Sequence, residues 1–236
     1  MTLANDYDSF AKAYADDNET GVNNAYYERP AMLALAGDVA GRRILDAGCG
    51  AGPLFAALRE RGATVSGFDK SAGMLELARR RLGDDADLRV ADLADPLPYE
   101  DDSFDDVVAS LSMHYLRDWG PTLAEIRRVL KPGGRFLMST NHPTAEYCIA
   151  RMNGQRPDYF ATYENTGEWT TATGQTIVLT NWNRPLHAMT DAFTAAGFRI
   201  SVISEPQPAP EARELFPDAY HLLATAPSFL FFVLAA

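Results

Sequence analysis

The sequence predicts an α/β protein whose strands form a mostly parallel, doubly wound sheet with helices on both faces. Short β-branched or apolar runs alternate with longer segments of helical spacing, which is typical of this fold class. A cluster of glycines directly follows the first apolar run, as expected where a strand turns sharply into a helix. The 236 residues, 47% of them hydrophobic, are enough for one large domain with a sizeable core.

The first 140 residues contain the clearest elements. Proline is tolerated in the first turn of a helix, so Pro53 favours a helix start there, and Ser71 is a good N-cap for the next helix. The third helix should stop at Lys131-Pro-Gly-Gly134, because proline and glycine end helices. The expected helices are 53–61, 71–82 and 118–130, and the expected strands are 43–46, 63–68, 87–91, 104–111 and 135–139.

The regular alternation then stops. Residues 141–183 are rich in aromatic residues, glycine, threonine and asparagine, which indicates an insertion, part helix and part irregular hairpin. A helix over 185–196, capped by Gly197, is expected to precede two last strands at 198–204 and 228–234, joined by a proline-rich loop over 205–219 without a helix. We therefore expect a single domain over 1–236, with an N-terminal helical cap at 1–40 and an aromatic-rich substrate lid at 141–183.

Charge and composition exclude several classes of protein. The chain has 21 basic and 32 acidic residues, a net charge of −11, which argues against a nucleic-acid partner because phosphate contacts need clustered Lys and Arg. Two cysteines cannot form a disulfide framework or a metal cluster, so no metal is expected. The start lacks a secretory pattern, and the apolar run 228–236 is too short to span a bilayer. The composition thus predicts a soluble, cytoplasmic protein that binds no membrane.

The glycine cluster is the first candidate binding motif. In Leu45-Asp-Ala-Gly-Cys-Gly-Ala-Gly52 the glycines allow a tight bend and a close approach of a ligand beside a helix N-terminus. The motif departs from the dinucleotide fingerprint, because the pattern is G-x-G-x-G and Pro53 occupies the last glycine position. The carboxylate of Asp46, just ahead of the first glycine, would repel a pyrophosphate but suits a cationic amino-acid ligand.

Two more carboxylates follow at the ends of predicted strands. Asp69 closes the second strand, where an acidic group can accept hydrogen bonds from both hydroxyls of a ribose. Asp92 closes the third, where it can accept from an exocyclic amine. Asp105 and Asp106 more simply cap a strand and stay solvated. Because parallel strands end at one edge of a sheet, Asp46, Asp69 and Asp92 should lie around one ligand site.

In this region the sequence resembles the class I S-adenosylmethionine-dependent methyltransferases, and within them the small-molecule type 11 group. The resemblance covers residues 42–140 in order and spacing. It rests on Ile44-Leu-Asp-Ala-Gly-Cys-Gly-Ala-Gly52, Gly67-Phe-Asp-Lys-Ser-Ala-Gly-Met74, Ala91-Asp-Leu93, Phe104-Asp-Asp-Val-Val-Ala-Ser110 and Leu130-Lys-Pro-Gly-Gly134. Tyr26-Tyr-Glu-Arg-Pro30 is also similar to the N-terminal helices of that group.

The resemblance implies a Rossmann-like sheet of seven strands, six parallel and the last antiparallel, and a site for S-adenosylmethionine. The glycines and Asp46 would hold the amino-acid end, Asp69 the ribose, and Asp92 with Leu93 the adenine. Arg29 could pair with the methionine carboxylate, although an exposed helix arginine is the safer expectation. The full set of cofactor-binding candidates is Tyr14, Asp46, Gly48, Cys49, Gly50, Gly52, Asp69, Lys70, Met74, Asp92, Leu93, Ser110 and Leu111.

Candidates for catalysis and substrate binding come from segments after the fourth and fifth strands. His114 and His142 follow strand ends on the side where the transferred methyl would lie, and either could accept a proton from the acceptor. Each could equally orient a loop. The candidates for substrate binding are aromatic, and those of the insertion could equally form a small separate core: Tyr115, Tyr147, Tyr163 and Trp169.

These observations predict an enzyme that transfers a methyl group from S-adenosylmethionine to an O, N or C nucleophile of a small, partly apolar molecule. Such an enzyme could assemble as a homodimer. One alternative is a protein of the same fold that binds the cofactor without transferring the methyl group, as a cyclase or a regulator. A second is an NAD-dependent oxidoreductase, against which the G-x-G-x-G run and Asp46 count.

Overall fold

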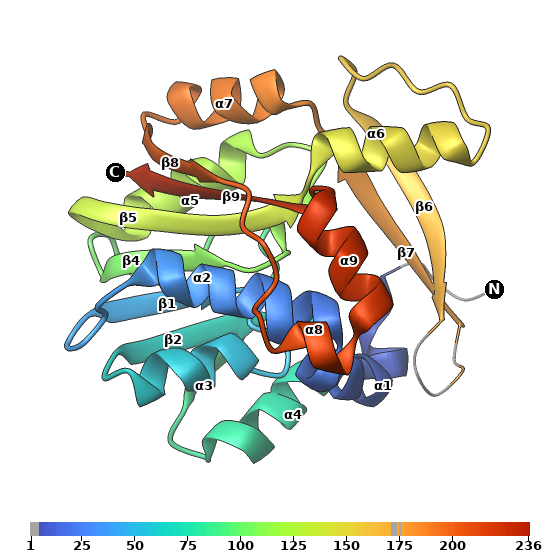
Figure 1. Cartoon of the computed structure of the whole chain (residues 1–236). Helices are drawn as coiled ribbons and strands as arrows, with labels where there is room; N and C mark the ends of the chain where they lie inside the picture. The colour runs from blue at the N-terminus through green and yellow to red at the C-terminus, as the bar shows by residue number, and fades with distance from the viewer. Residues whose placement is uncertain (1–4, 171–173, 175) are drawn as a thin grey trace.

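The computed structural model describes residues 5–170, 174 and 176–236 (Figure 1). Its main sheet has seven strands in the order β3-β2-β1-β4-β5-β9-β8. β9 is antiparallel to both of its neighbours, and the other pairs are parallel, which confirms the predicted pattern of six strands in one direction and one in the other. The strands are β1 (Arg43–Ala47), β2 (Thr64–Asp69), β3 (Asp87–Val90), β4 (Phe104–Ala109), β5 (Leu130–Asn141), β8 (Arg199–Ser204) and β9 (Phe229–Ala235).

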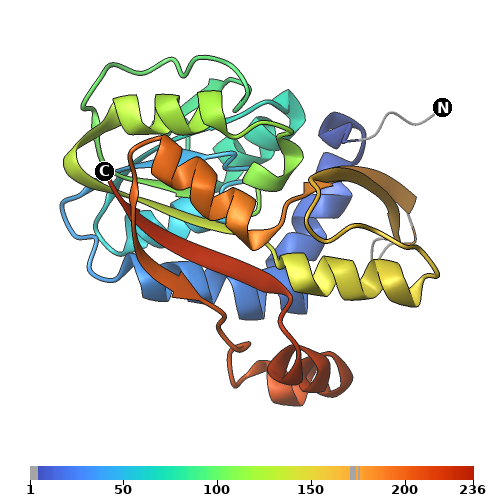
Figure 2. The same ribbon diagram turned by 90° about the horizontal axis from the view of Figure 1, so that it is seen from above.

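Helices cover both faces of this sheet. On one face α2 (Arg29–Ala36) and α3 (Pro53–Glu60) pack through Met32 and Phe55. On the other, α5 (Gly120–Val129) and α7 (Leu186–Ala195) pack through Ile126 and Phe193 (Figure 2). β9 alternates between the two cores, with Phe231 in one and Phe232 in the other, as a strand buried on both faces must.

Local signals explain where several elements begin. The hydroxyl of Ser71 accepts a hydrogen bond from the Met74 N–H at 3.0 Å, which caps α4 (Ala72–Leu82) as predicted. Pro53 occupies the first turn of α3. α5 ends at Val129, just before Lys131-Pro-Gly-Gly134 as expected. That segment is not a loop but lies inside a longer β5, which begins at Leu130 and pairs irregularly with β4 between Phe104 and Asp106.

The insertion after β5 has a helix and a regular hairpin. α6 (Pro143–Met152) is followed by β6 (Tyr163–Thr170) and β7 (Thr176–Asn183), which pair antiparallel as a separate sheet. In the residues that the structure describes on either side of 171–173 and 175, the hairpin is regular, not irregular as expected.

The segment between β8 and β9 differs from its prediction. It was expected to be a proline-rich loop without a helix, and it contains α8 (Ala212–Leu215) and α9 (Pro217–Thr225). Pro217 sits in the first turn of α9, where proline favours a helix. Figure 2 shows this pair projecting beyond the face that α2 covers.

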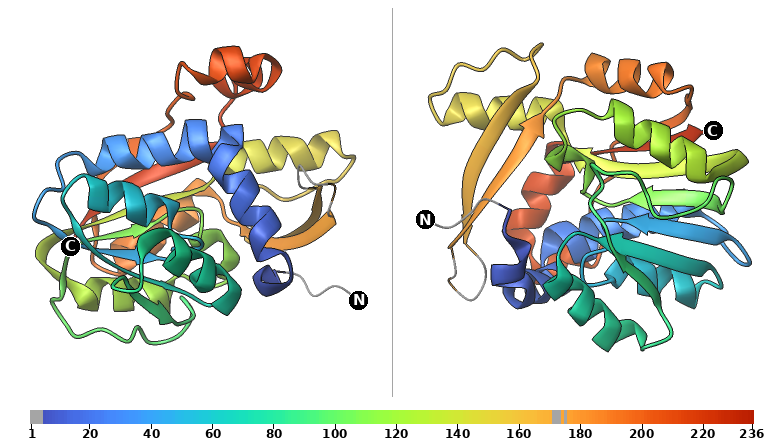
Figure 3. Two further views of the ribbon diagram at one scale, coloured as in Figure 1. Left: turned by 90° about the horizontal axis from the view of Figure 1, so that it is seen from below. Right: turned by 180° about the vertical axis from the view of Figure 1, so that it is seen from behind.

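The chain before β1 forms helices, and it contacts both α4 and the hairpin of the insertion. α1 (Tyr7–Thr20) packs on α4, and a π-helix, η1 (Asn24–Glu28), leads into α2. Asn5 pairs with β7: its backbone N–H donates to Val178, and its side-chain amide exchanges two hydrogen bonds with the backbone of Thr180 at 2.8 and 2.9 Å. The start of α1 is thereby attached to the hairpin, beside which it lies in Figure 3.

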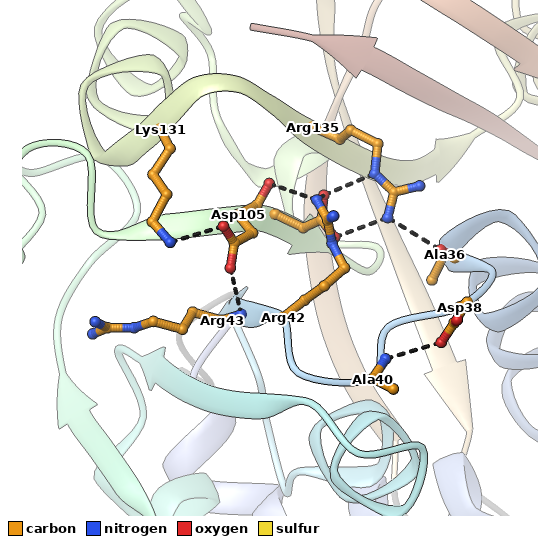
Figure 4. A network of polar contacts seen from close by, with 9 residues as sticks. Ala36, Asp38, Ala40, Arg42, Arg43, Asp105, Lys131 and Arg135 are labelled. Atoms are coloured by element: carbon orange, nitrogen blue, oxygen red, sulfur yellow. Dashed lines mark hydrogen bonds and ion pairs between the residues drawn. The ribbon is translucent and has the colours of Figure 1, made fainter.

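A polar network lies at the amino ends of β4 and β5. Asp106 is 1% exposed and binds the guanidinium groups of both Arg42 and Arg135, with four hydrogen bonds of 2.5 to 2.8 Å. Asp105 pairs with Lys131 at 2.8 Å (Figure 4). The expectation that Asp106 stays solvated was therefore wrong. Burial alone would raise the pKa of Asp106, but the two arginines outweigh burial and hold it below its ordinary value.

Candidate active site

Two adjoining cavities lie at the carboxyl ends of the parallel strands. β1 pairs with β2 on one side and with β4 on the other, so the connections diverge at β1 and leave a crevice, the usual ligand site of such sheets. The larger cavity has a volume of 240 Å³ and the smaller one 70 Å³. Four residues line both: Tyr14, Gly48, Gly50 and Ser110.

The three glycines of the turn after β1 serve different purposes. All have positive φ, which favours glycine. A side chain at Gly48 would come within 2.8 Å of the Ser112 Cβ, whereas one at Gly50 would meet no atom within 4 Å and would enter the cavity. Gly52 lines neither cavity; a side chain there would come within 2.9 Å of Leu82, so this glycine allows α3 and α4 to pack.

Asp46 is the most unusual group of the site. It is 1% exposed and lines the smaller cavity, and neither carboxylate oxygen meets hydrogen-bond geometry with a partner in the described part of the chain; the Phe55 N–H is near enough only to offset a small part of the rise in its pKa. Burial, together with the negative charges of Glu28 and Asp69, raises its pKa to about 8. Buried polar groups are nearly always paired, so this carboxyl is suited to a ligand that brings a cation or a donor.

Asp69 lines the larger cavity, and each of its carboxylate oxygens already accepts one hydrogen bond. Oδ2 accepts from the Gly50 N–H and Oδ1 from the Ser71 N–H, each at 2.9 Å. Each oxygen can accept a second hydrogen bond, so the group can still bind two hydroxyls. Asp92 lines the same cavity, and its Oδ1 accepts from the Ala94 N–H at 3.0 Å.

α1 closes the larger cavity. Tyr7 and Tyr14 line it from α1, and Tyr115 lines it from the turn after β4. The Tyr7 and Tyr115 hydroxyls are hydrogen-bonded, and burial raises the pKa of both phenols, so both stay protonated. Asp8 holds α1 in place by accepting from the Ser71 hydroxyl at 2.6 Å and the Gly73 N–H at 2.8 Å.

Comparison with known proteins agrees with this geometry. Residues 45–138 match the family model described as a methyltransferase domain. Over its whole length, a solved S-adenosylmethionine-dependent methyltransferase from Mesorhizobium loti superposes on 93% of this chain, with a TM-score of 0.70 and 25% identity. The chain contains a methyltransferase domain over residues 45–138, on the fold of the class I methyltransferases.

Two curated methyltransferases are similar to part of the chain. A demethylmenaquinone methyltransferase from Clavibacter sepedonicus is 42% identical over 134 residues, which are 56% of this chain and 55% of that protein. Methyltransferase GfsG from Streptomyces halstedii is 46% identical over 105 residues, 42% of this chain and 38% of that protein. The chain thus spans about half the length of these relatives or less.

The two cavities bring together most of the predicted cofactor residues. Among the predicted cofactor-binding residues, Gly52 is the one that lines neither cavity. The larger cavity is lined by Tyr14, Gly48, Gly50, Asp69, Lys70, Met74, Asp92, Leu93, Ser110 and Leu111, and the smaller one also by Asp46 and Cys49. Arg29 was expected to be exposed, but it lines the smaller cavity, partly buried, and donates to the Asn18 carbonyl oxygen at 2.7 Å.

Glu28 is a residue that sequence reasoning missed. It is 2% exposed at the end of η1 and lines the smaller cavity. Its Oε1 accepts from the Ser110 hydroxyl at 2.8 Å and the Ser139 hydroxyl at 2.5 Å. Ser139 in turn accepts from the N–H of Leu111, whose φ is +48°. Glu28 therefore stabilises, through Ser110 and Ser139, the strained turn after β4 that lines the larger cavity. Its position in Tyr26-Tyr-Glu-Arg-Pro30 is the one sequence signal that could have suggested it.

The two candidate catalytic histidines lie outside the cavity linings. His142 is the N-cap of α6: its Nδ1 accepts from the Thr144 N–H at 3.2 Å, and its Nε2 contacts Glu205 at 2.8 Å. This arrangement orients a helix and leaves no nitrogen toward the cavities. His114 is 7% exposed and packs against Tyr115, with ring centroids 4.3 Å apart.

We expect His114 to remain neutral across physiological pH. Burial lowers its pKa to about 4, because the charged imidazolium would lose its hydration. The imidazole resonances of His114, assigned by comparison with His114→Gln, should not shift between about pH 5.5 and 8 in an NMR titration. A midpoint near 6.5 would contradict the buried, uncharged state.

Some aromatic residues of the insertion pack with one another. Tyr147 and Tyr163 line a separate depression with Tyr159, and the Tyr147 and Tyr159 rings meet edge to face with centroids 5.6 Å apart. Of the four predicted substrate residues, Tyr115 alone among the described side chains lines the larger cavity. The side chain of Trp169 lies outside the described residues.

The remaining comparisons with the sequence concern membranes and metals. Within the described ranges, no helix is both long and apolar enough to cross a bilayer. The same part of the chain holds no group of three or more His, Cys, Asp or Glu arranged to bind a metal ion.

Proposed function

We propose that the protein transfers a methyl group from S-adenosylmethionine to a small, partly apolar molecule. The observation that carries this proposal is Asp46, a buried carboxyl without a partner among the described residues, at a glycine turn whose Gly50 leaves open space. A ligand with an amino-acid cation and a ribose fits this carboxyl together with Asp69. A pyrophosphate-bearing dinucleotide would place negative charge beside Asp46.

In this proposal each of the two cavities binds a different part of the cofactor. The smaller one takes the amino-acid end, with Asp46 toward the ammonium and Arg29 toward the carboxylate. In the larger one Asp69 accepts from the ribose hydroxyls and Asp92 from the adenine amine. When bound, the sulfonium supplies an activated methyl group, and the chain's own residues orient it and exclude water.

The acceptor side is formed by the lining residues that the cofactor does not need. Tyr7, Ser112, Tyr115 and Leu116 carry hydroxyl and apolar groups but no charged side chain. We infer an uncharged or weakly polar acceptor, held in line with the methyl group by the phenol pair. Alignment can supply most of the rate of such a displacement, so no histidine base is required. The net charge of −11 supports an acceptor other than nucleic acid.

The function is tested by turnover. Protein is incubated with methyl-labelled S-adenosylmethionine and a panel of acceptors, and S-adenosylhomocysteine and labelled product are measured by mass spectrometry. The panel starts with demethylnaphthoquinols, because one relative is named a demethylmenaquinone methyltransferase, and extends to other phenols, amines and acids. We expect product from at least one acceptor and none with Gly50→Val, which fills the open space at that turn.

Other outcomes of this experiment separate the alternatives. Cofactor binding without S-adenosylhomocysteine across the panel contradicts methyl transfer and favours a protein that uses the cofactor otherwise. Binding of NADH with no binding of S-adenosylmethionine overturns the cofactor assignment. The homodimer and the cytoplasmic location stay predictions.

A further inference from the structure

Two buried carboxyl groups face the same small cavity. Asp46 is 1% exposed and Glu28 is 2% exposed, and both line the 70 Å³ cavity beneath α1. They come from different elements, the end of β1 and the end of η1. Two carboxylates that share a buried site repel one another, so such a pair holds a proton more strongly than either acid would in water.

The surroundings do not neutralise Asp46. Glu28 accepts from two serine hydroxyls, but neither Asp46 oxygen has a hydrogen-bond partner within the described residues. The guanidinium of Arg29 donates to Asn18, and that of Arg81 pairs with Glu19 at 2.7 Å. The titratable and charged groups that face the pair are Tyr14 from α1, Arg29 from α2, Arg81 from α4, Cys49 from the turn after β1 and Asp69 from β2.

Burial favours the protonated form of both acids, and neighbouring negative charge favours it further at Asp46. Burial raises the pKa of Glu28, and burial with the charges of Glu28 and Asp69 raises that of Asp46 to about 8. Near neutral pH the pair therefore retains a proton.

We propose that Glu28 and Asp46 form a paired-carboxyl subsite that holds one proton in the free protein and releases it when the ammonium of the cofactor's amino-acid end binds. The carboxyl O–H bond breaks and its proton goes to the solvent, while the ammonium arrives with its own proton and donates to the carboxylate that is left. This makes Glu28 a positioning residue for the ammonium. The inference rests on the proposed function, because it takes S-adenosylmethionine as the cofactor.

Titration calorimetry with S-adenosylhomocysteine in buffers of different ionisation enthalpy measures the released proton. At about pH 6.5 the ligand's α-amino group is charged, so we expect about one proton released per ligand. The release should fall to zero at about pH 8 and turn into proton uptake at about pH 9, because the carboxyl pair is then already ionised and a neutral amine must gain a proton to bind. 5′-Methylthioadenosine is the matched control ligand. It carries the adenosine but no ammonium, and its binding should release no proton.

Variants assign the release to the pair. Glu28→Gln keeps the size of the side chain and an acceptor oxygen for the serines, so we expect the variant to fold. It should release less than half as many protons as the unaltered protein when S-adenosylhomocysteine binds. It should also bind S-adenosylhomocysteine about tenfold more weakly, while its affinity for 5′-methylthioadenosine stays unchanged. Asp46→Asn should abolish the release. Glu60→Gln is the control: it removes the same charge from an exposed residue of α3, so its proton release and its affinities should equal those of the unaltered protein.

Each contrary result has a distinct meaning. Binding of S-adenosylhomocysteine without buffer dependence overturns the inference and leaves the proposed function standing. Equal proton release with 5′-methylthioadenosine also overturns it, since the proton would then come from the adenosine side. No binding of S-adenosylhomocysteine at all overturns the proposed function and the inference together.

Discussion

Asp106→Ala is expected to lower the free energy of unfolding by about 3 kcal/mol. The change leaves Arg42 and Arg135 without the buried carboxylate that both of them bind. The side chains of Arg42 and Arg135 are 33% and 30% exposed, so the guanidinium groups can recover some hydration. The loss therefore falls at the lower end of the range for broken buried ion pairs. Urea unfolding followed by circular dichroism measures it.

The neighbouring residue provides the matched control. Asp105→Ala removes the same charge, but its ion pair with Lys131 is more exposed, at 27% and 39%, and such pairs contribute at most about 1 kcal/mol. The change also removes the acceptor of the exposed Arg43 N–H at 2.8 Å, so we expect a total loss of about 1–2 kcal/mol, still below that of Asp106→Ala. Equal losses in the two variants would contradict the special role of Asp106.

Asp69→Ala is expected to weaken S-adenosylhomocysteine binding by about 10- to 100-fold. A lost hydrogen bond to a charged acceptor costs about 1.5–3 kcal/mol, and the proposed ribose contacts depend on this carboxylate. The change also removes the acceptor for the Gly50 and Ser71 N–H groups, which loosens the turn. Titration calorimetry measures the affinity, and circular dichroism checks the fold.

Asp87→Ala serves as the control for Asp69→Ala. Asp87 lies on β3 with its side chain 47% exposed, so the substitution makes the same change in charge away from both cavities. Affinity should change by less than about twofold in this variant. Unchanged affinity in Asp69→Ala would overturn the ribose assignment.

The main sheet and the carboxylates of the proposed cofactor site could be predicted from local sequence patterns. The alternation of apolar runs and helical spacing locates the strands, and their parallel direction brings Asp46, Asp69 and Asp92 to one edge. These residues were predictable because each lies within two residues of the carboxyl end of its strand, so the position along the chain decides the position in space.

The other features depend on contacts between distant parts of the chain. Glu28 meets Ser139 across 111 positions, and Asp106 meets Arg42 and Arg135 across 64 and 29. No periodicity or spacing marks such pairs. His142 follows a strand end, as a catalytic residue could, but the helix that it caps uses its Nδ1, and only the geometry reveals that.

The position of β9 constrains the order in which the sheet can be completed during synthesis. β8 pairs with β9 and with no other strand of the described sheet, and β9 separates it from β5. A nascent chain that has emerged as far as β8 therefore has an apolar edge on β5 and an unpaired β8. Both are exposed to wrong strand pairing until about thirty further residues have left the ribosome.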